Sequence, residues 1–251
     1  MSLGEIAAIA LAGLAAGTIN TVVGSGTLIT FPVLLAFGYA PVMANVSNTV
    51  GLVPGSVSGA IGYRRELAGQ RRRAIRLGMM SVLGGITGAV LLLILPASVF
   101  KAVVPLFIAI ALALVILQPR LKQLLAEREI DAVHESGVAV ALAVYLTGVY
   151  GGYFGAAQGI LLLGILGVTL SQDLHRTNAL KNVLAGLTNG VAAAYFMFAA
   201  HVDWGPAGII AGASIVGAQL GARYGRRLPS AALRALIVVV GVSAILRLLI
   251  A

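Results

Sequence analysis

Long apolar segments with very few charged residues follow one another along this chain. They cover residues 3–38, 41–63, 74–95, 98–118, 137–170, 177–200, 204–222 and 229–250. Most of them reach the roughly 20 residues that a helix needs to cross a bilayer. Only 10% of the 251 residues are charged, whereas globular proteins carry about 25%. We therefore predict an all-α polytopic membrane protein with about 8–10 hydrophobic helices.

Two of these segments are longer than the others, and glycines interrupt both. The first cluster runs from Gly13 to Gly26 and the second from Gly148 to Gly159. Each glycine costs a helix roughly 1 kcal/mol relative to alanine, and lipid cannot satisfy the backbone groups that a broken helix exposes. The pattern predicts broken or re-entrant helices whose tips, Gly24–Thr27 and Gln158–Ile160, are buried inside the protein.

A shift of 133 residues partly overlays the chain on itself. The shift brings Gly26 onto Gly159, Asn45 onto Asn178, and Pro96 onto Pro229, together with several other residues. We expect a first transmembrane repeat at 1–118 and a second at 137–251. The charged segment 119–136 joins them, and we interpret it as a cytoplasmic linker.

The basic residues indicate how the repeats are oriented. All lysines and arginines except Lys101 and Arg247 fall into four clusters: Arg64, Arg65, Arg71, Arg72, Arg73 and Arg76; Arg120, Lys122 and Arg128; Arg176 and Lys181; and Arg223, Arg226, Arg227 and Arg234. Basic loops face the cytoplasm. All four clusters lie on that side if each repeat crosses an odd number of times, as three spans plus a hairpin or as five spans. This predicts inverted repeats in the cell (plasma or inner) membrane, with both termini outside. Inverted repeats with interrupted helices are typical of secondary transporters that work by alternating access.

A buried pair of helix tips suits an anion. The helix that follows each break presents free N–H groups and the positive end of its dipole. We expect these helices to begin at Thr27 and Ile160 and the substrate to lie between them. The substrate-binding candidates are Asn20, Gly24, Ser25, Gly26, Thr27, Asn45, Asn48, Thr49, Tyr153, Gln158, Gly159, Asn178, Lys181 and Asn182.

Several of these residues have two interpretations. Buried amides such as Asn45 and Asn178 either contact substrate or tie down the broken backbone nearby. Lys181 either neutralises the anion or extends to the cytoplasm beside Arg176. Tyr153 either gates the site or packs against a neighbouring helix. The glycines at small-xxx-small spacing (Gly84, Gly88, Gly217 and Gly221) predict close helix packing, within the fold or in a homodimer.

The motifs also resemble a known family. They are Gly151-Gly152-Tyr153-Phe154-Gly155 and Asn178-Ala179-Leu180-Lys181-Asn182 in the second half, and Ala44-Asn45-Val46-Ser47-Asn48-Thr49 after Gly17 to Gly26 in the first. With these motifs the chain resembles the TauE/SafE family of membrane transporters, the sulfite exporters, over nearly its whole length. The resemblance implies a transporter or exporter of small sulfur-containing anions, such as sulfite, sulfoacetate or related organosulfonates.

Other function classes find less support in the sequence. The chain contains no cysteine, which excludes disulfides and thiolate metal sites. His134, His175 and His201 fall in loops or near helix ends, where they cannot serve as the base of an intramembrane hydrolase. We predict no enzyme activity, no metal and no cofactor, and the expected partners are the lipid bilayer and a small anion. The net charge of +9 reflects basic loops, so we expect no nucleic-acid partner. A passive anion channel and a non-transporting membrane scaffold are the alternative functions.

Overall fold

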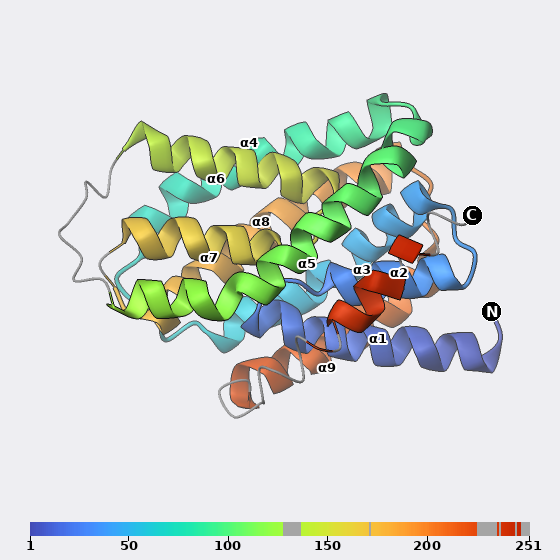
Figure 1. Ribbon diagram of the computed structural model, residues 1–251, viewed down its shortest axis with the longest axis horizontal. Coiled ribbons are helices and arrows are strands. Elements are labelled where there is room, and N and C mark those ends of the chain that lie inside the picture. The colour runs from blue at the N-terminus through green and yellow to red at the C-terminus, as the bar shows by residue number, and fades with distance from the viewer. Residues whose placement is uncertain (128–136, 171, 225–234, 236, 244, 247–251) are drawn as a thin grey trace.

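The computed structural model describes residues 1–127, 137–170, 172–224, 235, 237–243 and 245–246. Within these ranges the regular structure is helical and contains no strand (Figure 1). The helices are α1 (Leu3–Val22), α2 (Thr27–Ala36), α3 (Pro41–Gly62), α4 (Arg71–Ile94), α5 (Ala97–Glu127), α6 (Val138–Tyr153), α7 (Gln158–Thr169), α8 (Leu174–Ala199) and α9 (Trp204–Tyr224). The predicted all-α fold is confirmed.

Among the described residues, five helices are long and apolar enough to cross a membrane: α1, α4, α8, α9 and the Ala97–Leu121 part of α5. Large apolar side chains on their outer faces are exposed, for example Ile94 at 71% and Phe198 at 92%. Water would penalise such a surface, whereas lipid accepts it. The chain is therefore a polytopic membrane protein.

The first glycine cluster forms the tip of a helical hairpin. The chain turns after α1, and α2 runs back along α1, so that the Tyr39 hydroxyl donates to Glu5 Oε1 at 2.7 Å. Because α2 has ten residues, it is about 15 Å long, half of the roughly 30 Å hydrocarbon core. The second cluster forms a similar hairpin from α6 and α7. There α7 begins at Gln158, two residues before the expected Ile160.

The two hairpins enter from opposite ends of the molecule (Figure 1). α1 begins at the end where the N-terminus lies, and α6 begins at the other end. At the end where α6 begins, Arg176 Nη2 at the start of α8 donates to Ala68 O before α4, at 2.8 Å. At the N-terminal end, the N–H of Asp203 before α9 donates to Ser47 Oγ on α3, at 2.9 Å.

Helices from the first half of the chain pack against helices from the second half. α1 packs mainly against α9, α6 packs mainly against α4, and α3 lies against α8. The contacts need glycine: an added Cβ on Gly88 would lie 2.0 Å from Val149 O, and one on Gly217 would lie 2.0 Å from Leu14 O. The small-residue spacing therefore brings helices together within the protein.

The helix α5 continues without a break past Pro119, where the linker was expected to begin, and ends at Glu127. The rest of the predicted linker, 128–136, lies outside the described residues. The same holds for Arg226, Arg227, Arg234 and Arg247, so the structure describes only part of the last basic cluster.

Candidate functional site

The tips of the two hairpins meet backbone to backbone. The N–H of Gly159 donates to Gly24 O at 3.1 Å. A Cβ added to either glycine would lie 2.5 Å from the Cα of the other, and Gly24 has a positive φ of 90°. Only glycine allows both this approach and this backbone conformation. The structure thus brings together the tips whose convergence was expected.

The first tip carries hydrogen-bond donors that have no acceptor among the described residues. The Ser25 side chain is 1% exposed, and its Oγ has no hydrogen-bond partner. Among the described residues, no acceptor receives the backbone N–H groups of Ser25, Gly26 or Thr27. No side chain caps α2, so the positive end of its dipole lies open toward these groups. Buried donors at a helix N-terminus form a favourable site for an anion.

The second tip has a similar set of donors. Gln158 is 2% exposed and its Nε2 has no partner; its amide fills the space where a Cβ on Gly151 would lie, 2.3 Å from Cδ. The N–H groups of Ala156 and Ala157 donate to no described acceptor. Ala157 has a left-handed backbone with φ 60°, and the Tyr150 hydroxyl donates to Ala156 O at 2.5 Å, which fixes the turn. Successive N–H groups in such a turn form an anion-binding concavity.

Three side chains of α8 hold the end of α1. Asn178 Nδ2 and Asn182 Nδ2 each donate to Thr21 O at 3.3 Å. Lys181 Nζ lies 3.3 Å from Asn20 O and 3.5 Å from Thr21 O. The three side chains share a helix face because they are three or four residues apart. They satisfy carbonyls that the last turn of α1 leaves without helical partners.

A matching contact holds the end of α6. Asn45 Nδ2 on α3 donates to Tyr153 O at 3.0 Å. Because a carbonyl only accepts, the amide nitrogen of Asn45 must face Tyr153, as that of Asn178 must face Thr21. The Oδ1 atoms of Asn45 and Asn178 are then buried without a partner. The asparagines therefore tie down the interrupted backbone, and each retains a spare acceptor.

Lys181 lies inside the protein. Its side chain is 0% exposed, so the interpretation that it extends to the cytoplasm beside Arg176 is wrong. An ammonium group costs much free energy to bury unless nearby groups stabilise its charge. Here the carbonyl oxygens of Asn20 and Thr21 do so in part.

Other candidate residues connect the helices around the first tip. Asn48, 0% exposed, donates to Thr27 Oγ1 at 3.3 Å and accepts from the hydroxyl of Thr30. Thr49 Oγ1 donates to the carbonyl of Asn45 at 2.8 Å, and the amide of Asn20 donates to Ser56 Oγ at 3.3 Å. In this structure Asn48 positions α2 against α3 and Asn20 connects α1 to α3, whereas the Thr49 bond lies within α3.

An aromatic cluster covers the second tip from the side of α5. Phe154 lies with its ring centroid 5.2 Å from that of Phe31 and 6.0 Å from that of Phe100. Tyr153 is 5.7 Å from Phe100 and 6.0 Å from Phe107. Tyr153 thus packs against a neighbouring helix, as one interpretation of the sequence held, and the packing closes the tip on this side.

Some groups at the site were not predicted. They are the carbonyl of Thr21, the hydroxyls of Thr30 and Ser56, and the rings of Phe100 and Phe107. Every residue has a backbone carbonyl, so the sequence cannot indicate which one accepts these hydrogen bonds. Phe100 and Phe107 lie in a segment that is apolar throughout, so nothing distinguishes them from lipid-facing residues. In the described ranges, no three His, Asp or Glu side chains come together as a metal site.

Comparison with known proteins identifies the family of this chain. The sequence profile described as "Sulfite exporter TauE/SafE" matches residues 9–248. This chain belongs to the TauE/SafE family. The matched region includes both glycine tips and the α3 and α8 residues that hold them.

Curated relatives of this TauE/SafE chain are described as probable membrane transporters. The chain is 30% identical to "Probable membrane transporter protein ORF9" of Sinorhizobium sp over 242 residues, which is 95% of this chain and 90% of that protein. It is 28% identical to YfcA of Escherichia coli strain K12 over 215 residues, 85% of this chain and 76% of YfcA. A Haemophilus influenzae relative is 27% identical over 84% of this chain and 81% of that protein. No solved structure matches the chain.

Proposed function

We propose that this protein is a secondary transporter that exports small sulfur-containing anions, such as sulfite, sulfoacetate or a related organosulfonate. The observation that carries the proposal is the meeting of two tips whose buried donors have no protein acceptor. Gly24 and Gly159 are in contact, Ser25 Oγ and Gln158 Nε2 have no partner, and the adjacent N–H groups are open. Lys181 adds a buried basic side chain in the same interior.

Alternating access is the mechanism that this arrangement favours. The two hairpins enter from opposite ends, α1 packs against α9, and α6 packs against α4. This arrangement suits two inverted halves that rock against each other around the tips. The described arginines fall before and at the start of α4, in the last part of α5, at the start of α8 and at the end of α9. These segments lie at the end of the molecule opposite the N-terminus (Figure 1), which supports an external N-terminus and a cytoplasmic linker in the cell membrane. The small-residue faces are used within the fold, so we do not extend the proposal to a homodimer.

The spare acceptors favour a guest that also carries a proton. The Oδ1 atoms of Asn45 and Asn178 are buried without a donor, and an unsatisfied buried acceptor costs about 1–3 kcal/mol. A singly protonated oxyanion, such as hydrogen sulfite, would supply a donor while its other oxygens accept from the tips. This predicts that sulfite transport follows the concentration of the singly protonated anion as the pH is varied.

The direct test is flux into proteoliposomes that contain the purified protein. We expect saturable uptake of sulfite or a sulfonate that is stimulated by the same anion inside the vesicles, and little uptake of taurine, sulfate or chloride. Ohmic single-channel current would instead establish a passive anion channel. Absence of flux for every anion in the panel would favour a membrane scaffold, and the proposed function would then be wrong.

Lys181 allows a sharper test, because its hydrogen bonds can be separated from its charge. Lys181→Gln keeps a donor for the carbonyls of Asn20 and Thr21 but removes the positive charge, whereas Lys181→Met removes both. At a contact distance near 4 Å the charge would contribute up to roughly 4 kcal/mol to anion binding. We expect both variants to lose transport at least tenfold.

The matched control is Lys101→Met, which removes an exposed lysine at the start of α5 and should transport normally. If Lys181→Gln transports as well as the wild type, Lys181 is a structural residue that does not act on the anion. Monodisperse elution of each variant in detergent establishes that the loss of flux is not a loss of fold.

A further inference from the structure

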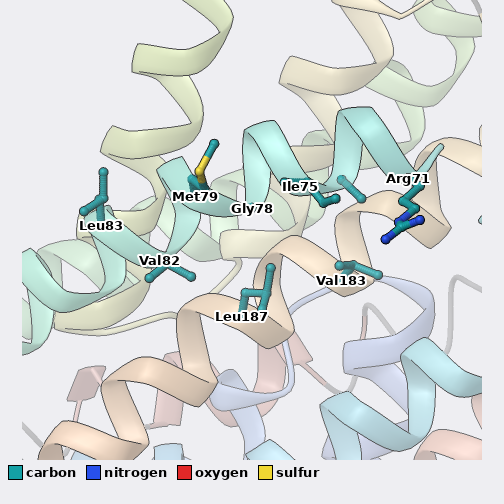
Figure 2. Close-up of a pocket in the computed structure, with 9 residues that line it drawn as sticks. Arg71, Ile75, Gly78, Met79, Val82, Leu83, Val183 and Leu187 are labelled. Carbon is teal, nitrogen blue, oxygen red and sulfur yellow. The ribbon is translucent and has the colours of Figure 1, made fainter.

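A groove between α4 and α8 opens on the outer surface of the protein, away from the tips. It has a volume of about 550 Å³ and is lined by Arg71, Ala74, Ile75, Gly78, Met79, Val82, Leu83, Val183 and Leu187. Figure 2 shows the α4 side chains along one side and Val183 and Leu187 directed toward them from α8. Apart from Arg71, every side chain that lines the groove is apolar.

Helical spacing explains the shape of the groove. Ile75, Met79 and Leu83 follow Arg71 at intervals of four residues and form a ridge on α4. Beside this ridge the small residues Ala74 and Gly78 leave a depression. A Cβ on Gly78 would lie 2.9 Å from Leu187 Cδ1, so a larger residue there would occupy the floor of the groove.

The groove has the length of one lipid leaflet. From residue 71 to residue 83 the helix rises about 18 Å, and half of the hydrocarbon core is about 15 Å thick. Its walls are open to the surroundings, because Ile75, Met79 and Leu83 are 55%, 53% and 51% exposed. In a membrane, these side chains contact acyl chains.

Positive charge gathers at one end of the groove. Arg71 lines that end, and Arg72 and Arg76 are exposed beside it, none of the three with a hydrogen bond or ion pair to a described residue. Of the carboxylates at this end, Asp173 already accepts from the N–H of His175 at the start of α8, and Glu66 precedes α4. A basic pocket between transmembrane helices suits the head group of an anionic lipid.

We propose that this groove binds one anionic phospholipid, with an acyl chain along Ile75, Met79 and Leu83 and its phosphate at Arg71. Val183 in the groove directly follows Asn182, which holds the end of α1. The bound lipid therefore braces the α4–α8 contact beside a residue of the candidate site.

The test is native mass spectrometry of the purified protein with phosphatidylglycerol or phosphatidylcholine of identical chains. We expect the wild type to retain one phosphatidylglycerol in preference to phosphatidylcholine. Arg71→Gln should lower the affinity for phosphatidylglycerol about fivefold, the effect of roughly 1 kcal/mol per basic residue. Lys101→Gln removes the same charge at an exposed position at the start of α5, beyond the opposite end of α4, and should leave the preference unchanged. Gly78→Leu should weaken both lipids, because it fills the groove.

Equal retention of the two lipids by the wild type would overturn the proposal, as would equal effects of Arg71→Gln and Lys101→Gln. A second copy of the chain is the other possible occupant. Since the chain has no cysteine, Met79→Cys is a single-cysteine probe, and efficient disulfide dimerisation in liposomes would show that a protein partner covers the groove. Failure of anion transport in the flux assay would leave the lipid result unaffected, so the two proposals fail separately.

Discussion

Gly159→Ala tests the contact on which the candidate site depends. The added Cβ would lie 2.5 Å from the Cα of Gly24 and 3.0 Å from its carbonyl oxygen. Both are backbone atoms, which cannot rotate away as the end of a side chain can. Forcing the tips apart by this amount should cost about 1–3 kcal/mol, as other overpacking substitutions do. We expect a lower thermal midpoint in detergent and a transport rate reduced at least tenfold, since separation of the tips disperses the donors.

The matched control is Gly190→Ala in α8, where an added Cβ meets no atom within 4 Å. Alanine is favoured over glycine inside a helix by roughly 1 kcal/mol, so this variant should be slightly more stable and should transport normally. Gly24→Ala should be worse than Gly159→Ala, because its positive φ of 90° adds about 1–2 kcal/mol of strain. If Gly159→Ala has wild-type stability and transport, the tips do not meet as described and the site must lie elsewhere.

Two further comparisons follow from the contacts around the tips. Asn45→Ala should destabilise the protein by about 1–3 kcal/mol, because Asn45 is the described side-chain donor to Tyr153 O. Asn182→Ala should cost less, because Asn178 and Lys181 still donate to the carbonyl of Thr21. Equal shifts of the thermal midpoint in the two variants would contradict this reasoning. Phe100→Leu weakens the aromatic cluster over the second tip and should raise the rate of anion counterflow. The control Phe198→Leu, at a position that is 92% exposed, should leave the rate unchanged, and an unchanged rate in both would mean that the cluster does not limit opening.

The sequence predicted those parts of the fold that depend on local chemistry. Apolar length identified the helices, and the cost of glycine inside a helix indicated the breaks at the two glycine clusters, which the structure places around Gly24 and just before Gln158. Spacing along the segment that forms α8 predicted that Asn178, Lys181 and Asn182 share one face. Each of these features follows from residues that are close together in the chain.

What the sequence left open depends on atoms that come from distant segments. Whether Asn45 contacts substrate or backbone could not be decided, because its partner is the carbonyl of Tyr153, 108 residues away. The sequence could not decide the position of Lys181 either. A lysine at the eighth residue of a helix can reach the interior or the surface, and here the placement of the α1 carbonyls decides. The glycine spacing at Gly88 and Gly217 likewise did not distinguish contacts within the fold from contacts between copies.

The two halves differ in charge at corresponding positions, and this difference bears on which anion the site can hold. Under the 133-residue shift Asn48 corresponds to Lys181, and Ser25 corresponds to Gln158. The ties to the interrupted helices are similar in both halves, but Lys181 supplies the one charged side chain among the candidate residues. A single ammonium balances one negative charge, and a second negative charge in a dry interior would lack compensation. Within the proposed substrate class, hydrogen sulfite and sulfonates with one negative charge should therefore be preferred over doubly charged sulfoacetate and over sulfate. Lys181→Gln should weaken the binding of the singly charged anions without making sulfate a better substrate.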